Sequence, residues 1–210
     1  MPLLSSTSIT NHITLYLWRI DETLEVLNKG ASLTLKEKEK FKNIKLIKNK
    51  KQWLASKYII RQHINSNGKL QYNENGKPYC NLFYDISISH SDNLIVLITS
   101  NKQKVGIDIE TIGNKVVRIG DKFLHPEEKA SFTESNFQLM HHIYWGAKEA
   151  IYKMMNVKGV EFKSQIRILA FELADEGKTV GTFTHMGIKE NIEVFYKKIN
   201  NSILVYTLNI

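Results

Sequence analysis

Apolar and polar residues alternate along several short stretches of the chain. Ile13, Leu15 and Leu17 are separated by Thr14, Tyr16 and Trp18, so residues 13–20 predict a strand. The same period predicts further strands over residues 85–89, 94–99, 105–110, 166–173, 180–185, 192–199 and 203–208. Turns such as Glu176-Gly177 and Asn200-Asn201 are expected to separate the last four.

Helical spacing of apolar residues replaces this alternation in three regions. Residues 34–65 predict a long helical region, with Thr34 as its cap and Glu37 at the spacing of a capping box. A helix is expected to begin near Pro126 and run through Phe132, and another to cover residues 137–155. This order of elements favours an α+β fold with antiparallel sheets. The join at residues 100–104 suggests two domains, 1–103 and 104–210.

Composition narrows the class of protein. The chain has 210 residues, of which 42% are hydrophobic and 24% charged, which is ordinary for a globular protein. The single cysteine, Cys80, excludes an internal disulfide framework and a cysteine-rich zinc site. No apolar run approaches a membrane span and the start does not read as a secretory signal. We therefore expect a cytoplasmic protein with no membrane partner.

The positive charge is concentrated in one segment. Lysine and arginine exceed aspartate and glutamate by 29 − 21 = 8, and residues 36–51 hold eight lysines and two glutamates. Such a run is usually a solvated helix face. Lysines three or four positions apart project together, however, and form a surface that attracts anions. The run alone leaves both interpretations open.

The segment Asp85-Ile-Ser-Ile-Ser-His-Ser91 ends a predicted strand in two hydroxyls and an imidazole. Side chains of this kind at a strand end are good phosphate ligands. The alternative, which this segment alone favours, is a polar turn beside a serine-rich edge.

Two carboxylates stand out in Val105-Gly-Ile-Asp-Ile-Glu110. Alternation places Asp108 and Glu110 on one face of a strand, about 7 Å apart along it. Carboxylates held this way repel each other unless a cation lies between them, and oxygen ligands suit Mg²⁺ or Mn²⁺. The alternative is an exposed strand face.

The helix over residues 137–155 offers a third carboxylate, Glu149, one turn before Lys153. The pair is either a routine surface ion pair or a metal ligand with a charge that stabilises a phosphate. His141 and His142 lack a third partner at metal-ligand spacing, so we interpret them as surface or structural residues.

In combination, these patterns resemble the 4′-phosphopantetheinyl transferases of the Sfp type. The resemblance rests on four motifs in order: Gly76-Lys-Pro78, Ser89-His-Ser91, Gly106-Ile-Asp-Ile-Glu110, and Trp145-Gly-Ala-Lys-Glu-Ala150 with Lys153. They span residues 76–153, and the basic segment extends the likeness to about residue 36. The carboxy-terminal strands resemble the family only in general pattern.

The resemblance implies a pseudo-dimer of two similar α+β halves with the active site in the cleft between them, and a monomeric protein. It implies Mg²⁺-dependent transfer of the phosphopantetheine arm of coenzyme A to a serine of an acidic acyl or peptidyl carrier protein, with release of adenosine 3′,5′-bisphosphate. Asp108, Glu110 and Glu149 would hold the metal, and Glu149 and Lys153 would be catalytic. Lys148 and Trp145 would support the site, and Glu128 would lie next to these supporting residues without touching the coenzyme. The coenzyme-binding residues implied are Lys40, Lys51, Gly76, Lys77, Pro78, Ser89, His90 and Lys148.

One position departs from the family pattern. Members often carry an arginine in the amino-terminal helix that holds the 3′-phosphate, and Gln52 occupies that position here, beside Lys51. Lys40, Lys51 and His90 would share the task.

Two other functions compete with this interpretation. A Mg²⁺-dependent nuclease would also be basic with strand carboxylates, but it needs a lysine two residues after the second acid, where Ile112 stands. A nucleic-acid-binding module would use residues 36–51 on phosphates, but it leaves Asp108 and Glu110 unexplained. We therefore expect no nucleic-acid partner.

Overall fold

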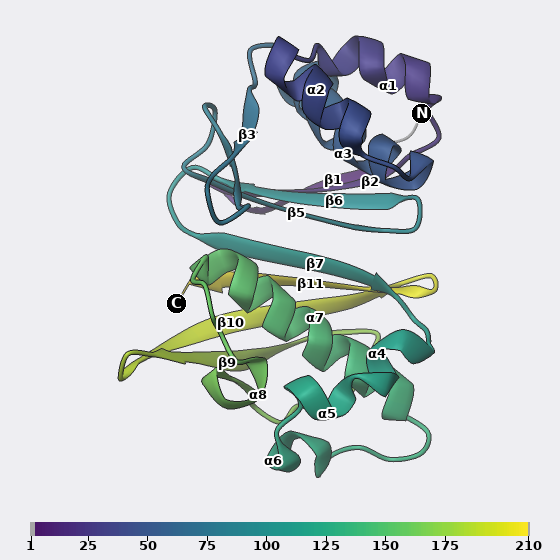
Figure 1. Cartoon of the computed structure of the whole chain (residues 1–210). Helices are drawn as coiled ribbons and strands as arrows, with labels where there is room; N and C mark the ends of the chain where they lie inside the picture. The colour runs from purple at the N-terminus through teal and green to yellow at the C-terminus, as the bar shows by residue number, and fades with distance from the viewer. Residues whose placement is uncertain (1–2, 210) are drawn as a thin grey trace. The chain divides into compact units, whose positions relative to one another are not determined.

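The computed structural model describes residues 3–209, and the chain divides into two compact units, residues 1–101 (unit 1) and 102–210 (unit 2). Each unit combines helices with an antiparallel sheet, so the fold is α+β, as predicted (Figure 1). Among the described residues, no helix has both the length and the apolar character that a bilayer crossing requires.

Unit 1 is a four-stranded antiparallel sheet in the order β1-β2-β6-β5, with helices on one face and a separate β3-β4 hairpin. Its elements are β1 (Leu3–Thr10), β2 (Ile13–Arg19), α1 (Leu24–Ala31), α2 (Leu35–Asn43), α3 (Ile47–Ile59), the π-helix η1 (Ile60–Ile64), β3 (Leu70–Tyr72), β4 (Pro78–Cys80), β5 (Asp85–Ser91) and β6 (Leu94–Ser100).

The predicted long helical region is divided into α2, α3 and η1. Thr34 and Glu37 form the predicted capping box at the start of α2. The backbone then leaves the helix at Ile44, whose ψ of 115° is extended. Asn43, just before it, is a weak helix former. Apolar spacing continues across this break, which is why the sequence did not reveal it.

A core of apolar side chains joins the helices of unit 1 to the sheet. Its fully buried members come from β2, α1, α3, η1, β5 and β6 and include Trp18, Leu27, Leu54, Ala55, Ile59, Ile60, Ile86, Ile95 and Leu97. Helix α2 contributes no buried residue. Its position therefore depends on other contacts, described below.

Unit 2 is a five-stranded antiparallel sheet in the order β7-β11-β10-β9-β8, with the long helix α7 packed across it. Its elements are β7 (Val105–Thr111), α4 (Asn114–Arg118), α5 (Gly120–Phe123), α6 (Pro126–Lys129), α7 (Phe137–Met155), α8 (Phe162–Gln165), β8 (Ile166–Ile168), β9 (Glu176–His185), β10 (Ile188–Ile199) and β11 (Ser202–Asn209).

Three predictions in unit 2 were wrong in extent. The helix that begins at Pro126 ends at Lys129, and the strand predicted over 166–173 ends at Ile168. The predicted turn at Glu176-Gly177 lies inside β9. Gly177 allows the side chain of Tyr196 to pack closely against β9, because a Cβ at this position would lie 2.6 Å from the hydroxyl oxygen of Tyr196.

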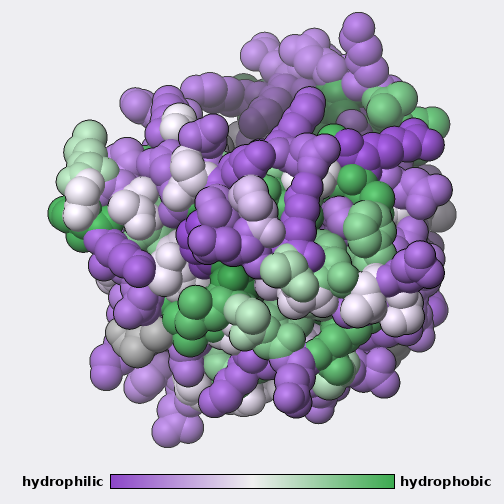
Figure 2. Space-filling view, turned by 90° about the horizontal axis from the view of Figure 1, so that it is seen from below, coloured by the Kyte–Doolittle hydropathy of each residue, from purple (hydrophilic) through white to green (hydrophobic). Residues whose placement is uncertain are grey.

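The short helices α5 and α6 lie at one end of unit 2. Seen from that end, hydrophobic surface gathers in a band among hydrophilic side chains (Figure 2). A cavity of about 600 Å³ lies between α4, α5 and α7, and the rings of Phe132, Phe137 and His141 line it. These rings also pack on one another, with Phe137 and His141 centroids 4.4 Å apart.

Candidate active site

Strand β7 presents Asp108 to helix α7. The apolar residues that alternate with it, Ile107 and Ile109, are fully buried. Oδ1 of Asp108 accepts a hydrogen bond of 2.6 Å from Nζ of Lys153, which also donates to the carbonyl oxygen of Ile107. Asp108 is only 4% exposed, so the alternative of an exposed strand face is wrong for this residue.

Two glycines let α7 approach β7 this closely. A Cβ on Gly106 would lie 1.9 Å from the backbone oxygen of Ala150, which no packing tolerates. A Cβ on Gly146 would lie 2.7 Å from the side chain of Val205 on β11 and 3.7 Å from Oδ2 of Asp108. The glycines of the two motifs therefore set the separation between the strand and the helix that carry the acidic residues.

The three acidic residues influence one another's ionisation. Burial, reinforced by the charges of Asp108 and Glu110 and opposed by Lys153, raises the pKa of Glu149 to about 7. Burial and the Asp108 carboxylate raise the pKa of Glu110, and a hydrogen bond from Trp145 opposes that rise. The structure thus brings Asp108, Glu110, Glu149 and Lys153 into one electrostatically coupled group, formed by β7 and α7.

The donor chemistry of this group fits a divalent cation. Carboxylate oxygens are the ligands that Mg²⁺ prefers, and a cation would relieve the mutual repulsion that, after burial, contributes to the raised pKa values of Glu110 and Glu149. No set of three or more histidine, cysteine, aspartate or glutamate side chains within residues 3–209 is already arranged as a metal site. The group is therefore chemically suited to a metal without having the geometry of a finished one.

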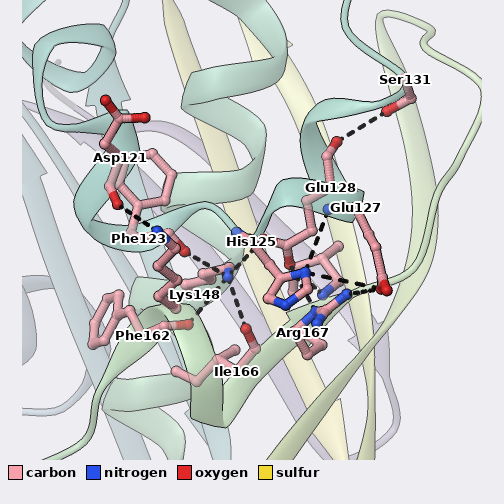
Figure 3. A network of polar contacts seen from close by, with 12 residues as sticks. Asp121, Phe123, His125, Glu127, Glu128, Ser131, Lys148, Phe162, Ile166 and Arg167 are labelled. Carbon is pink, nitrogen blue, oxygen red and sulfur yellow. Dashed lines mark hydrogen bonds and ion pairs between the residues drawn. The ribbon is translucent and has the colours of Figure 1, made fainter.

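Lys148, the residue before Glu149 on α7, lies at the centre of a buried network (Figure 3). Its ammonium is within hydrogen-bond distance of the carbonyl oxygens of Phe123, Phe162 and Ile166, at 2.7, 3.1 and 2.7 Å, and of Oε2 of Glu128 at 2.8 Å. The Lys148 side chain is 0% exposed. This burial favours a supporting role over the direct coenzyme contact predicted for Lys148.

Glu128 completes the network from α6. Its Oε2 also accepts the backbone N–H of His125, and its Oε1 accepts the backbone N–H of Ile168. One carboxylate and one ammonium thus connect α7 to α5, α6, α8 and β8, which fits the supporting place expected for Glu128.

The predicted coenzyme contacts of unit 1 fall partly on the β5 strand. Ser89 is buried and His90 is exposed, and β5 continues through Ser91 instead of ending at Ser89. The β5-β6 turn is at Asp92, whose φ of 51° is left-handed. Because His90 and Ser91 pair with β6, they belong to the strand and not to the predicted loop.

The motif Gly76-Lys-Pro78 lies in the β3-β4 hairpin of unit 1. Gly76 takes a left-handed φ of 82°, as a tight turn requires, and Pro78 begins β4. Nζ of Lys77 lies 2.7 Å from Oδ2 of Asp85, and both side chains are nearly buried. Asp85 therefore fixes the lysine of this motif next to β5.

The helices α2 and α3 carry Lys40 and Lys51. Nζ of Lys40 lies 5.4 Å from the ring centroid of Tyr72. Nζ of Lys51 donates to the backbone oxygen of Glu22 at 2.8 Å, and Lys51 borders a cavity of about 490 Å³ together with Lys48 and Gln52. The Gln52 amide donates to the backbone oxygen of Asp92 at 3.1 Å and so connects α3 to the β5-β6 turn.

The two adjacent histidines are structural residues, and the surface alternative is wrong for both. His142 is 0% exposed and accepts a hydrogen bond from the backbone N–H of Gly113 at 3.1 Å, with its other nitrogen on the carbonyl of Gln138. His141 is 3% exposed and bonds the carbonyl of Phe137. Burial lowers the pKa of each imidazole, which keeps the rings neutral.

Sequence reasoning missed Lys57. This lysine follows the basic run on α3, and nothing in its spacing distinguishes it from a surface lysine. In the structure its side chain is 5% exposed and paired with Glu37. Its burial depends on Glu37, which lies on a different helix, so no local pattern in the sequence marks it.

The carboxy-terminal half of the chain is similar to a known protein family. Residues 104–206 match the family model of the 4′-phosphopantetheinyl transferase superfamily. This half of the chain belongs to that superfamily. The match contains Asp108, Glu110, Glu149 and Lys153, so the coupled acidic group lies entirely within the superfamily segment.

Individual relatives carry the same family name. The chain is 33% identical over 111 residues to 4′-phosphopantetheinyl transferase Gsp of Aneurinibacillus migulanus, covering 49% of this chain and 46% of that protein. It is 30% identical over 112 residues to 4′-phosphopantetheinyl transferase AcpT of Salmonella typhimurium, covering 48% of this chain and 56% of that protein. The matched segments thus span about half the length of these relatives.

Proposed function

We propose that this protein is a 4′-phosphopantetheinyl transferase that moves the phosphopantetheine arm of coenzyme A to a serine hydroxyl of a carrier protein. The observation that supports the proposal is the contact between Asp108 and Lys153, together with the electrostatic influence of Asp108, Glu110 and Lys153 on Glu149, inside the segment that matches the superfamily. Under this proposal the two units are the two related halves of the Sfp type.

The reaction exchanges the phosphoanhydride bond of coenzyme A for a phosphodiester bond to the carrier serine. The serine oxygen forms a bond to the phosphorus that carries the pantetheine arm, and the bond from that phosphorus to the bridging pyrophosphate oxygen breaks. Adenosine 3′,5′-bisphosphate leaves with the bridging oxygen, and the serine proton passes to a base. Such a transfer depends mainly on positioning and on neutralising charge.

The residues of unit 2 supply these needs. Lys153 is held by Asp108 and places a fixed positive charge where the leaving phosphate gains negative charge. Glu149 takes the serine proton, directly or through water. Asp108, Glu110 and Glu149 would hold Mg²⁺, with Mn²⁺ as a substitute, and the bound cation would supply further neutralisation of the pyrophosphate.

The residues of unit 1 bind the nucleotide end of coenzyme A in this proposal. Ser89 and His90 contact phosphates, Gly76, Lys77 and Pro78 line the adenine side, and Lys40 and Lys51 contribute positive charge. The net charge of +8 would also favour encounter with an acidic carrier protein. We propose that the protein acts as a cytoplasmic monomer.

Intact-mass spectrometry tests the proposal. The purified protein is incubated with coenzyme A, Mg²⁺ and several apo carrier proteins, and each carrier is examined for the added phosphopantetheine arm. A carrier whose acceptor serine is replaced by alanine controls for adventitious attachment, and a parallel reaction with a chelator tests the metal. Absence of modification in every carrier, with a folded enzyme and intact coenzyme A, would refute the proposal.

A further inference from the structure

The lysine buried in unit 1 contacts groups from several elements at once. Nζ of Lys57 lies 2.5 Å from Oε1 of Glu37 and donates to the carbonyl oxygen of Leu70 at 2.8 Å. The same ammonium lies 5.1 Å from the ring centroid of Trp53 and 5.9 Å from that of Tyr72. Lys57 on α3 therefore connects its own helix to α2 and β3.

Glu37 connects this ammonium to the start of helix α2. Its Oε2 accepts hydrogen bonds from the backbone and the hydroxyl of Thr34, at 2.9 and 3.0 Å, while its Oε1 accepts from Lys57. One carboxylate thus caps α2 and anchors it to α3. Because α2 has no buried residue, this anchor and the stacking of Phe41 on Trp53 help to fix its position.

Lys40 lies three residues after Glu37 on the same helix and shares a partner with Lys57. Its ammonium is 5.4 Å from the centroid of Tyr72, so this ring has one ammonium from α2 and one from α3 within 6 Å. A ring face attracts a cation electrostatically but, unlike a carboxylate, has no negative charge that would neutralise the cation. Lys40 is in this way oriented while its charge stays available to an anion.

We propose that Lys57 is a positioning residue that acts through Glu37 and Tyr72 to hold the Lys40 ammonium where it binds a phosphate of coenzyme A. The inference rests on the proposed function for its ligand, and on the contacts of Lys57 for its mechanism. Lys57 itself is too buried to touch the coenzyme. Its effect is on coenzyme affinity and not on the transfer step.

A double-mutant cycle tests the inference by measuring the KM for coenzyme A and kcat with one apo carrier protein. We expect Lys40→Gln to raise the KM about tenfold, as loss of one charge-assisted phosphate contact would. We expect Lys57→Met to raise it by about the same factor with kcat changed less than about twofold. In the Lys57→Met background, Lys40→Gln should add less than about a twofold change, since Lys40 is then no longer held.

The cycle separates positioning from stability. If Lys57 only stabilises the fold, Lys57→Met lowers the melting temperature, but the two substitutions multiply in their effect on KM, and that result would overturn the inference. Lys29→Met, an exposed lysine on α1, is the matched control and should leave KM unchanged. Should Lys57→Met fail to fold, Glu37→Gln takes its place, because glutamine retains the capping box.

A second measurement does not need the enzyme to be active. In the folded wild-type protein, the ring of Tyr72 should shift the proton resonances of the Lys40 methylene groups upfield, with Lys40→Gln identifying the signals. We expect these signals to return toward random-coil positions in Lys57→Met. Unchanged shifts would overturn the positioning of Lys40. Failure of wild-type protein to bind coenzyme A would instead refute the proposed function, and with it the phosphate ligand assigned to Lys40, while the methylene shifts would still test whether Lys57 positions Lys40.

Discussion

Lys153 on α7 donates a 2.6 Å hydrogen bond to Oδ1 of Asp108 on β7, although the two residues are 45 positions apart in the sequence. This contact joins the strand and helix motifs of the chain. The Asp108 side chain is 5% exposed and that of Lys153 27%, so the lysine is the more accessible partner. Under the proposed function, the ammonium is therefore the part of this pair that a phosphate would reach more easily.

Replacement of the buried carboxylate should abolish transfer. Asp108→Asn keeps the shape of the side chain but removes the charge that holds Lys153 and the proposed cation. We expect a loss of at least about 100-fold in the rate of carrier modification, measured by intact mass. Thermal unfolding should show a folded protein. Near-normal turnover would contradict the assignment of Asp108 to the site.

Lys153→Met should affect the chemical step more than binding. The lysine is expected to stabilise charge that develops on the leaving phosphate, so kcat should fall about 100-fold while the KM for coenzyme A changes by only a few fold. Steady-state kinetics with one carrier protein separates the two. A raised KM with normal kcat would limit Lys153 to binding the coenzyme.

How far the sequence predicts this fold is clear from individual elements. Helix α7 has the predicted bounds, residues 137–155, because Ile143, Ala147 and Ile151 repeat along one face for its whole length. The break after Asn43 was missed because apolar spacing continues across it. Local pattern thus located α7 and most strands but missed β1 and α1, and the ends of α6 and β8 depend on packing against other segments.

The acidic site, like the fold, could be predicted from the sequence only in part. Residue types and alternation put Asp108 and Glu110 on one strand face, but they left open whether that face is exposed. Burial of Asp108 depends on the approach of α7, which a Cβ on Gly106 would block. Lys148 and Lys57 were beyond prediction for a related reason: a lysine is buried only when acceptors from distant segments meet at its ammonium, as Glu128 and Glu37 do.

The buried Lys148–Glu128 pair should contribute strongly to stability. Lys148→Met leaves the Glu128 carboxylate buried without its cation, so we expect the free energy of unfolding to fall by roughly 3–5 kcal/mol. Lys129→Met is the matched control, since Lys129 pairs with Asp121 at the surface and its loss should have a much smaller effect. Urea denaturation measures both. Equal, small losses would show that the network is not a main support of unit 2.

The Glu37–Lys57 pair predicts a pH dependence of stability. Partial burial acts to raise the pKa of Glu37, but the hydrogen bonds from Lys57 and Thr34 outweigh it, and the pKa lies below the usual 4.5. A lowered folded-state pKa stabilises the protein fully above the unfolded value, and this contribution disappears as the pH falls through the folded value. The stability difference between wild type and Glu37→Gln should therefore be largest near pH 7 and shrink below pH 4.5. A difference that is constant from pH 7 to pH 3 would contradict the pairing.

The close approach of α7 to β7 predicts that Gly106 tolerates no side chain. In Gly106→Ala the new methyl group meets the backbone oxygen of Ala150, which cannot rotate away, so the helix must shift. We expect about 1–3 kcal/mol of destabilisation from overpacking. We also expect a loss of transfer activity in the fraction that remains folded, because the shift separates Glu149 from Asp108. Gly113→Ala is the control: its backbone is extended, and no atom lies within 4 Å of the added Cβ. If the folded Gly106→Ala protein kept full activity, the spacing between β7 and α7 would not set the geometry of the acidic group.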